Sequence, residues 1–376
     1  MAGTFEAPEV VQEEVDILMI GGGMACCGAG YEIMRWADAV KAEKGIDLKI
    51  KLVDKAAMDR SGAVAQGLSA INTYIGDQDP ADYARMVSND LMGITRDDLA
   101  YDLGRCVDDS VHLFEEWGLP IWKTDEKGER HDGSKGLPAL KDGGKPVRSG
   151  KWQIMINGES YKWIVAEAAK KALGLDRIQE RVFIVKLIND KNDKNRIAGA
   201  VGFSVRENKI YIYKAKAVLL AAGGCVNLFR PRSVGEGQGR AWYPVWNAGS
   251  TYSMAAEAGA ELTMMENRFV PARFKDGYGP VGAWFLLFKA RAANAYGEDY
   301  MTKNKDMLND YPPYGQAAVP ASCLRNHLML KEMKEGRGPI YMDTVTALAK
   351  LAETLTPKEV KHLEAEAWED FLDMCI

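Results

Sequence analysis

Residues 15–30 read VDILMIGGGMACCGAG, an apolar run that leads through three glycines into a helical pattern. This order of strand, glycine turn and helix is typical of a site that holds a pyrophosphate. Gly21 would allow the tight turn and Gly23 would let the backbone approach the ligand. The helix N-terminus would direct its N–H groups and dipole at the anion. Cys26 occupies the position where a third glycine is usual, so the surrounding sequence has to supply further evidence.

The surrounding sequence completes a strand–helix–strand unit. A helical run from about Tyr31 to Lys44 precedes a strand pattern at residues 48–53, and the strand ends on Asp54. A carboxylate at that position accepts hydrogen bonds from the ribose hydroxyls of an adenine dinucleotide. We therefore predict a Rossmann-like α/β domain that binds a dinucleotide. The alternative is a glycine-rich turn in another kind of α/β protein.

Composition limits the class of protein. The chain has 376 residues, 47% hydrophobic residues and a formal net charge of −5. This length is sufficient for two domains, and the charge argues against a general nucleic-acid surface. No run reaches the about 18 uninterrupted apolar residues of a membrane span, and the acidic N-terminus lacks the features of a signal peptide. We therefore expect a cytoplasmic protein.

The cysteines give no sign of a metal site. The six cysteines are grouped neither as an iron–sulfur or zinc motif nor as a secreted disulfide framework. We expect reduced, mostly buried thiols and no metal bound by this chain.

The rest of the chain alternates between helical and strand periodicity. Helical spacing occurs at residues 80–92, 97–117, 160–173 and 253–260. The Gly-, Lys- and Asp-rich residues 122–151 are expected to form an exposed loop. Strand patterns occur at residues 182–185, 197–203, 210–213 and 217–222. The polar turns between these strands predict a β-meander inserted into the α/β domain.

The last of these strands and the C-terminal sequence carry two further signals. The strand is uniformly apolar, which predicts burial on both faces, and it runs into Ala221–Gly224, a strand end typical of the ligand edge of a sheet. Thr356 and Glu359 form a capping box that opens a helix, and the helical pattern still continues at Ile376. Since natural C-termini seldom fall inside such a pattern, we expect an N-terminal fragment.

Several motifs together resemble the fumarate reductase and succinate dehydrogenase flavoprotein family. They are the glycine turn at residues 21–28, SGAVAQG at 61–67, AAGG at 221–224 and EGRGPIYMD at 335–343. Their order and spacing are similar to that family along the whole chain. Within the family, three runs resemble the alpha subunits of dissimilatory adenylylsulfate (APS) reductases: residues 22–28, 153–162 and 273–284.

The resemblance implies a fold, a cofactor and partners. It implies a Rossmann-like FAD-binding domain with the inserted β-meander at residues 1–266, without its closing C-terminal part. The start of an α+β capping domain would follow at residues 267–376. It also implies noncovalent FAD, interconversion of APS with AMP and sulfite, a ferredoxin-like iron–sulfur beta subunit that carries 4Fe–4S clusters, and an indirect link to a membrane electron-transfer complex.

Two departures from the wider family refine this expectation. Covalently flavinylated members carry a histidine after the serine, whereas Gly62 follows Ser61 here, so FAD should be dissociable. Dicarboxylate enzymes carry a histidine in a Gln-x-His-Pro-like run, whereas this chain has FVPAR at residues 269–273. Succinate or fumarate is therefore not the expected substrate.

The resemblance also implies catalytic residues. Arg273 and Arg325 stand in motifs similar to those of the reductases, and arginine neutralises a phosphosulfate by bidentate hydrogen bonding. Arg268 is a weaker candidate for substrate binding. A surface ion pair is the alternative for each arginine. Trp242 is expected to stack at the isoalloxazine edge and offer a path for electrons, or else to be a core or interface residue.

The remaining candidate residues line the substrate and cofactor sites. Glu159 and Asn72 match polar positions of the same pocket, one holding a proton or an arginine and the other bonding flavin or substrate. An apolar adenine slot, or alternatively core packing, is expected for Phe269, Val281, Phe285 and Leu286. The residues expected to bind FAD are Gly21, Gly23, Met24, Ala25, Asp54, Lys55, Ser61, Gln66, Gly67, Asn72, Ala222, Gly223 and Gly224.

We therefore expect the alpha subunit of an FAD-dependent oxidoreductase that converts APS, although this fragment alone should not be competent. One alternative is another small-anion reductase of the same flavoprotein family, which the run at residues 269–273 would discriminate. The other alternative is a nonenzymatic flavin-binding assembly protein, which the absence of a yellow chromophore would favour.

Overall fold

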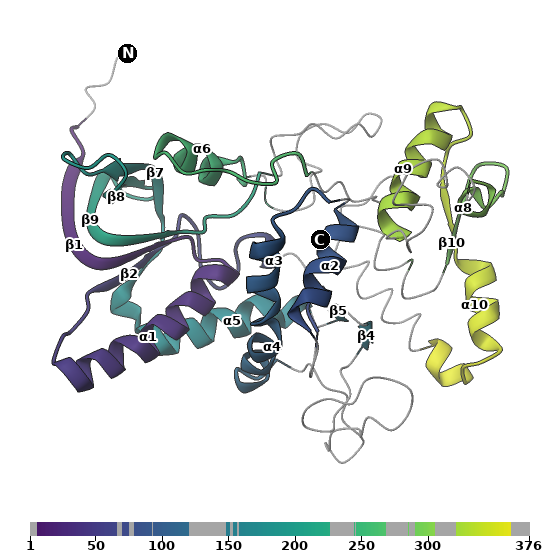
Figure 1. The fold of residues 1–376 in the computed structure, drawn as a ribbon, viewed down its shortest axis with the longest axis horizontal. Coiled ribbons are helices and arrows are strands. Elements are labelled where there is room, and N and C mark those ends of the chain that lie inside the picture. The colour runs from purple at the N-terminus through teal and green to yellow at the C-terminus, as the bar shows by residue number, and fades with distance from the viewer. Residues whose placement is uncertain are drawn as a thin grey trace. The chain divides into compact units, whose positions relative to one another are not determined.

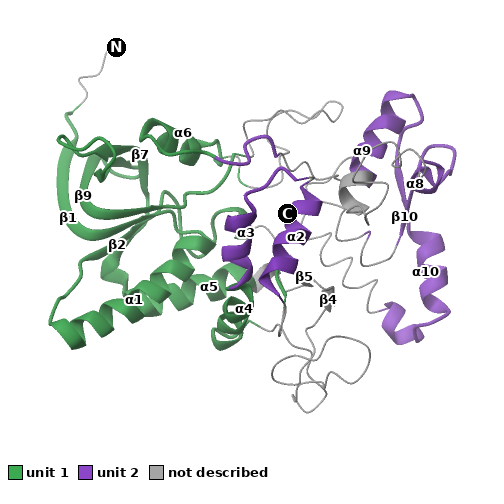
Figure 2. Cartoon of the chain, viewed as in Figure 1, with its two compact units in different colours: residues 1–77, 106–262 green, residues 78–105, 263–376 purple. Residues whose placement is uncertain are grey.

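The computed structural model of the chain describes residues 6–65, 70–74, 79–91, 93–119, 148–150, 153–155, 158–225, 244, 246–267, 285, 290–304 and 321–361. The chain forms two compact units, which Figure 2 distinguishes by colour. Unit 1 comprises residues 1–77 and 106–262, and unit 2 comprises residues 78–105 and 263–376. Each unit has its own hydrophobic core.

Unit 1 is built on a six-stranded sheet with the strand order β6-β2-β1-β9-β8-β7 (Figure 1). Its strands are β1 (Glu9–Ile20), β2 (Ile50–Val53), β6 (Ile178–Gln179), β7 (Val182–Asn189), β8 (Ile197–Ser204) and β9 (Lys209–Leu220). The pairs β6–β2, β2–β1 and β1–β9 are parallel, whereas β9–β8 and β8–β7 are antiparallel. This mixed sheet confirms the predicted α/β fold with its β-meander, and β9 belongs to both parts.

Helices cover the sheet of unit 1. The helices α1 (Met24–Lys44) and α5 (Gly158–Leu173) pack against each other along one face (Figure 1). Because successive side chains of a strand point to opposite faces, Met19 packs with these helices while Leu18 packs on the other face. There Met254 of α6 (Ser250–Glu257) joins the second core cluster. The end of β1 is thus buried on both sides.

Smaller elements complete unit 1. They are α4 (Val107–Glu116), short 3₁₀ turns at Ala63–Ala65 and Leu175–Arg177, and an antiparallel sheet in the order β3-β5-β4. The strands of that sheet are β3 (Ala70–Asn72), β4 (Arg148–Gly150) and β5 (Gln153–Met155).

Unit 2 is mostly helical. Its elements are α2 (Pro80–Asp90), α3 (Asp97–Gly104), β10 (Arg291–Ala293), α8 (Tyr300–Lys303), α9 (Ala321–Lys334), β11 (Tyr341–Asp343) and α10 (Thr344–Ala352). The strands β10 and β11 pair antiparallel. The capping box predicted at the next helix is confirmed, because Glu359 Oε2 accepts the Thr356 N–H at 2.8 Å and the Glu359 N–H donates to Thr356 Oγ1 at 3.3 Å.

Three predictions about elements were wrong. Residues 97–117 form two helices, because the chain leaves the helical ladder at Arg105 and Cys106 and α4 begins anew with two aspartates in its first turn. The predicted strands 210–213 and 217–222 are one strand, β9. Its central lysines are exposed and pair across to β1, with Lys214 Nζ 2.9 Å from Glu14 Oε1.

The end of β9 is also not buried on both faces as predicted, because Leu219 is 36% exposed. Its apolar composition therefore did not reflect burial within the described part of the chain. Most of the predicted loop at residues 122–151 lies outside the described residues.

The described part of the chain contains neither a cluster of metal-ligating side chains nor a helix that could span a membrane. Within the described ranges, no group of three or more His, Cys, Asp or Glu side chains is arranged to hold a metal ion. No helix among those residues combines the length and the apolar character that crossing a membrane requires.

Candidate dinucleotide site

The candidate site lies where three neighbouring parallel strands end. Directly after β1, the Gly21 N–H donates to the carbonyl oxygen of Val53 on β2 at 2.8 Å. On the other side, the Ala221 N–H donates to the carbonyl oxygen of Ile20 at 2.9 Å. A Cβ atom on Gly21 would lie 2.4 Å from the Ala221 carbonyl oxygen, and Gly21 has φ +115°. Only glycine fits this close approach of two loops.

The helix that follows offers an open N-terminus. Gly23 is the N-cap of α1 and makes no side-chain capping bond. A Cβ atom on Gly23 would meet no described atom within 4 Å. The first N–H groups of a helix have no intrahelical partner, and together with the helix dipole they favour an anion. The loop therefore leaves room for a phosphate beside the N-terminal N–H groups of α1.

Asp54 holds the glycine loop from the end of β2. Its Oδ2 atom accepts the Gly22 N–H, and its Oδ1 atom accepts the Ala56 N–H at 2.6 Å. Carboxylate oxygens can each accept more than one hydrogen bond, so both retain capacity for a ribose hydroxyl. Asp54 therefore has a structural role in addition to the ligand contact that the sequence predicts.

Lys162 is a residue of this site that the sequence reasoning missed. It lies on α5 and is 2% exposed, and its Nζ atom donates to the Gly22 carbonyl oxygen. The helical spacing of the sequence indicates that Lys162 is buried, because Lys162 lies on the same face of α5 as the buried residues Val165 and Ala166. A lysine on an apolar stripe calls for a specific buried partner.

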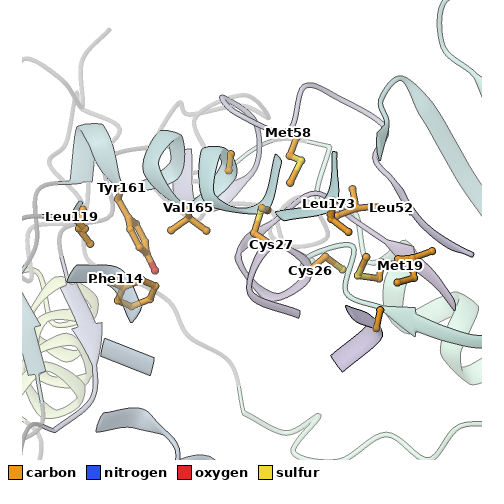
Figure 3. Close-up of a cluster of buried hydrophobic side chains, with 14 of the residues drawn as sticks. Met19, Cys26, Cys27, Leu52, Met58, Phe114, Leu119, Tyr161, Val165 and Leu173 are labelled. Atoms are coloured by element: carbon orange, nitrogen blue, oxygen red, sulfur yellow. The ribbon is translucent and has the colours of Figure 1, made fainter. Parts of the chain in front are cut away.

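Two thiols lie beside this lysine in the core between the sheet and the helices. Figure 3 shows Cys26 and Cys27 among Met19, Leu52 and Leu173. Burial raises the pKa of Cys26 to about 12 and also raises the pKa of Cys27. Both side chains are therefore protonated packing groups at neutral pH.

The expectation of mostly buried thiols holds for only part of the described set. Cys26 and Cys27 are buried, but Cys225 is half-buried and Cys106 is exposed. The exposure of Cys106 follows from its position at the N-cap of α4, between two helices that the sequence suggested were one.

The loops after β9 and β2 contact a common segment. Gly223 has φ +92°, and a Cβ atom there would lie 3.3 Å from the Asn247 side chain. The Gly224 carbonyl oxygen accepts the Gly249 N–H at 3.3 Å. Lys55 Nζ donates to the Trp246 carbonyl oxygen at 2.7 Å, and burial lowers the pKa of Lys55. Residues 246–249 thus connect two loops that carry predicted ligand residues.

Other predicted residues of unit 1 lie on separate elements. Met24 and Ala25 form the first turn of α1, and the Met24 Sδ accepts the Tyr161 hydroxyl at 3.2 Å. Asn72 ends β3 as an exposed residue opposite Gln153 of β5. Three more of the predicted residues also belong to described segments of unit 1: Ser61, Ala222 and Glu159, the last in the first turn of α5.

In unit 2 the structure brings two predicted residues together. The Arg325 Cζ atom lies 4.1 Å from the centre of the Phe285 ring, and Arg325 is 7% exposed. Phe285 also belongs to the hydrophobic core of this unit, with Tyr300 and Leu328. The guanidinium thus lies over an aromatic face, as in a cation–π contact. The other predicted site residues lie outside the described residues: Gln66, Gly67, Trp242, Arg268, Phe269, Arg273, Val281 and Leu286.

Comparison with known proteins gives a consistent set of similarities. Residues 16–292 match the FAD binding domain family. The chain is 67% identical over 374 residues to adenylylsulfate reductase subunit alpha of Megalodesulfovibrio gigas, which covers 98% of this chain and 56% of that protein.

Two solved structures are similar over the same length. Adenylylsulfate reductase from the hyperthermophilic Archaeoglobus fulgidus is 54% identical with a TM-score of 0.85, covering 98% of this chain and 55% of that one. An adenosine-5-phosphosulfate reductase in complex with sulfite, as a covalent adduct, is 54% identical with a TM-score of 0.84 and the same coverage of both chains. The chain thus spans about half the length of the relatives that it matches.

Proposed function

This chain belongs to the family of FAD-binding domains, and from that premise we propose that it acts in an adenylylsulfate reductase. The chain would be the flavin-binding part of the alpha subunit. It would hold FAD noncovalently and take part in the interconversion of APS with AMP and sulfite. The 67% identity to an alpha subunit of that name supports the substrate and the reaction.

The single observation that best supports FAD binding is the arrangement of residues around the glycine loop. Gly21 lies against the Ala221 carbonyl, the space at Gly23 is open, and Asp54 keeps acceptor capacity at the end of β2. This arrangement fits the diphosphate and the ribose of FAD. Because Gly62 follows Ser61, the histidine expected of covalently flavinylated relatives is absent from that position.

When it is bound, FAD supplies the two-electron redox chemistry at the sulfur of APS. The residues of this chain bind and orient the reactants. The N-terminus of α1 takes the diphosphate, and Asp54 takes the ribose hydroxyls. Arg325 and Arg273 would neutralise the phosphosulfate as negative charge moves onto the leaving AMP. Trp242 would stack at the flavin edge, and Glu159 and Asn72 would contribute polar groups.

The partner in this proposal is an iron–sulfur beta subunit. The reaction exchanges two electrons, and the cysteine spacings of this sequence match no iron–sulfur motif. A ferredoxin-like partner with 4Fe–4S clusters would exchange those electrons with the flavin as part of a cytoplasmic heterodimer. An indirect link to a membrane electron-transfer complex would complete the electron path.

The proposal is tested on the full-length protein, purified together with its partner. Acid precipitation should release FAD into the supernatant, and the purified complex should form APS from AMP and sulfite with an electron acceptor. Flavin that stays in the pellet would contradict the noncovalent site. A yellow protein that turns over a different small anion and not APS would favour another reductase of the same family. A colourless protein would favour a role in assembly alone.

A further inference from the structure

Lys162 is buried beneath the glycine loop and bonds to the carbonyl oxygen of Gly22 within it. It is 2% exposed, its Nζ atom donates to the Gly22 carbonyl oxygen, and the same atom lies 3.9 Å from Cys27 Sγ. Among the residues that the structure describes, the partners of this ammonium group are the Gly22 carbonyl oxygen and Cys27 Sγ, and it forms no ion pair with a carboxylate. A buried charge is costly unless an opposite charge compensates for it. The surroundings of Lys162 therefore favour an anion close by.

The peptide groups of Gly22 are held by side chains of opposite charge. Asp54 Oδ2 accepts the Gly22 N–H, and Lys162 donates to the Gly22 carbonyl oxygen. That carbonyl belongs to the same planar trans peptide as the Gly23 N–H, and the two groups point in opposite directions. Lys162 on the buried side therefore directs the Gly23 N–H away from the core. That N–H lies at the N-terminus of α1, where a Cβ atom on Gly23 would meet no described atom within 4 Å.

The hydrogen bond from Lys162 to the Gly22 carbonyl oxygen also makes the Gly23 N–H a stronger donor. A carbonyl that accepts a hydrogen bond from a cation is polarised, and the polarisation extends through the peptide to its N–H group. The Gly23 N–H consequently becomes a stronger donor to a phosphate oxygen. A diphosphate at this position would in turn compensate the charge of Lys162 across a single peptide group.

We propose that Lys162 is a positioning residue for the diphosphate of the bound dinucleotide. It fixes the Gly22–Gly23 peptide with its N–H outward and places a positive charge behind the loop. This inference rests on the proposed FAD site and names the residue that tunes that site for a diphosphate. It differs from simple core packing because it predicts selectivity for the charge of the ligand.

The test uses the full-length protein from which FAD has been removed. Binding of FAD is followed by the quenching of its fluorescence, and ADP and adenosine are then used as competitors that displace FAD. ADP contains the diphosphate and adenosine does not. In Lys162→Met the dissociation constant of ADP should rise about tenfold or more, because the Gly23 N–H is then no longer held outward and strengthened, and the positive charge behind the loop is lost. The dissociation constant of adenosine should change less than about twofold.

Two further variants make the result decisive. Lys171→Met removes the same charge from an exposed position of α5 and should leave both dissociation constants unchanged. Lys162→Gln keeps a donor without the charge and serves if the methionine variant does not fold; it should weaken ADP binding by a smaller factor.

Equal weakening of ADP and adenosine in both Lys162 variants would show a purely structural role and overturn the proposal. Unchanged ADP binding in the Lys162 variants would also overturn the proposed role of Lys162, but it would not contradict the proposed FAD site. If the unmodified protein binds neither FAD nor ADP, the proposed function itself fails.

Discussion

At the scale of single residues, Gly21 and Gly23 serve the same loop in different ways. A methyl group on Gly21 would lie 2.4 Å from the Ala221 carbonyl oxygen at φ +115°, whereas one on Gly23 would meet no described atom within 4 Å. Gly21→Ala should therefore lower the free energy of unfolding of the flavin-free full-length protein by about 3 kcal/mol. Gly23→Ala should change it by less than about 0.5 kcal/mol but raise the dissociation constant of FAD about tenfold or more.

Urea unfolding and fluorescence titration with FAD measure these two effects separately. Gly28→Ala is the matched control, because a Cβ atom at this position of α1 would meet none of the described atoms of neighbouring segments within 4 Å. It should leave FAD binding unchanged. A destabilised Gly23→Ala protein that binds FAD normally would contradict this account of the loop.

The cysteines differ in reactivity for a reason that the fold supplies. With a pKa of about 12, Cys26 is ionised in only roughly one molecule in ten thousand at pH 8, and it is fully buried. Cys106 is exposed. Iodoacetamide should therefore alkylate Cys106 in the native protein, while Cys26 and Cys27 react only after unfolding. Mass spectrometry of tryptic peptides measures the order, and early labelling of Cys26 would show that this core opens readily.

Arg325 is the described member of the predicted arginine pair. In the full-length enzyme, Arg325→Ala should lower kcat/KM for APS about a hundredfold, or about 3 kcal/mol, because bonds that strengthen as AMP leaves are lost. Arg325→Lys should recover only part of the activity, since a point charge does not reproduce the planar guanidinium. Flavin content should not change. Unaltered kcat/KM would assign Arg325 a structural role, which includes its packing on Phe285.

At the scale of elements, the end of α9 is tied to the turn after β10 by a buried carboxylate. Arg337 donates from Nε to Glu332 Oε2 at 2.5 Å and from a terminal nitrogen to Glu332 Oε1 at 2.7 Å. The Asn294 amide donates to Oε2 at 2.9 Å. The hydrogen bond from Arg337 is the main cause that lowers the pKa of Glu332 to about 2.

This pKa sets the pH range in which the contact stabilises the fold. Because the folded pKa lies below the unfolded value of 4.5, the stabilisation is present above about pH 4.5 and is lost as the pH falls towards about 2. Glu332→Gln should lower the Tm at pH 6, and the difference from the unmodified protein should shrink between pH 5 and 3. Glu335→Gln, which removes the exposed partner of the same arginine, is the control. A Tm difference that is constant with pH would assign the effect to packing.

Helices and strands could be predicted from the sequence where the local pattern of residues agrees with the contacts made in the folded chain. The first strand, the glycine turn, the helix α1 and the acid at Asp54 were recognisable because each is encoded within a few neighbouring residues. The split of α3 from α4 and the continuity of β9 were not, because both depend on distant partners. The lysines that interrupt the apolar pattern of β9 are satisfied by acids on β1, which no local window contains.

In the candidate site, too, the residues of a local motif could be predicted and those that depend on distant partners could not. The glycines and Asp54 belong to a local motif, whereas Lys162 reaches the loop from a helix 140 positions away in sequence. Its buried contact becomes apparent only once α1 and α5 are packed together. The pairing of Arg325 with Phe285 likewise joins two motifs that the sequence suggested separately.

At the scale of the whole molecule, the proposed reaction requires an electron-transfer partner outside this chain, which accepts two electrons when APS is formed. Iron analysis of the separately purified full-length alpha subunit should find essentially none, and APS formation should depend on adding the beta subunit. The same preparation should retain its FAD, which distinguishes a missing electron partner from a damaged flavin site. Stoichiometric iron in the isolated subunit would require a cluster site that the cysteine pattern does not suggest.

The pairing of β1 with β9 also determines when the flavin site can form during synthesis. Each paired residue of β1 lies opposite the residue 200 positions later, so that Ile20 meets Leu220. A ribosome that adds roughly 5–20 residues per second needs roughly 10–40 seconds to cover that distance. Until then the glycine loop has no Ala221 carbonyl to close against. The nascent chain thus carries its first strand unpaired on the β9 side for that period, and capture of FAD becomes a late event that follows emergence of the meander.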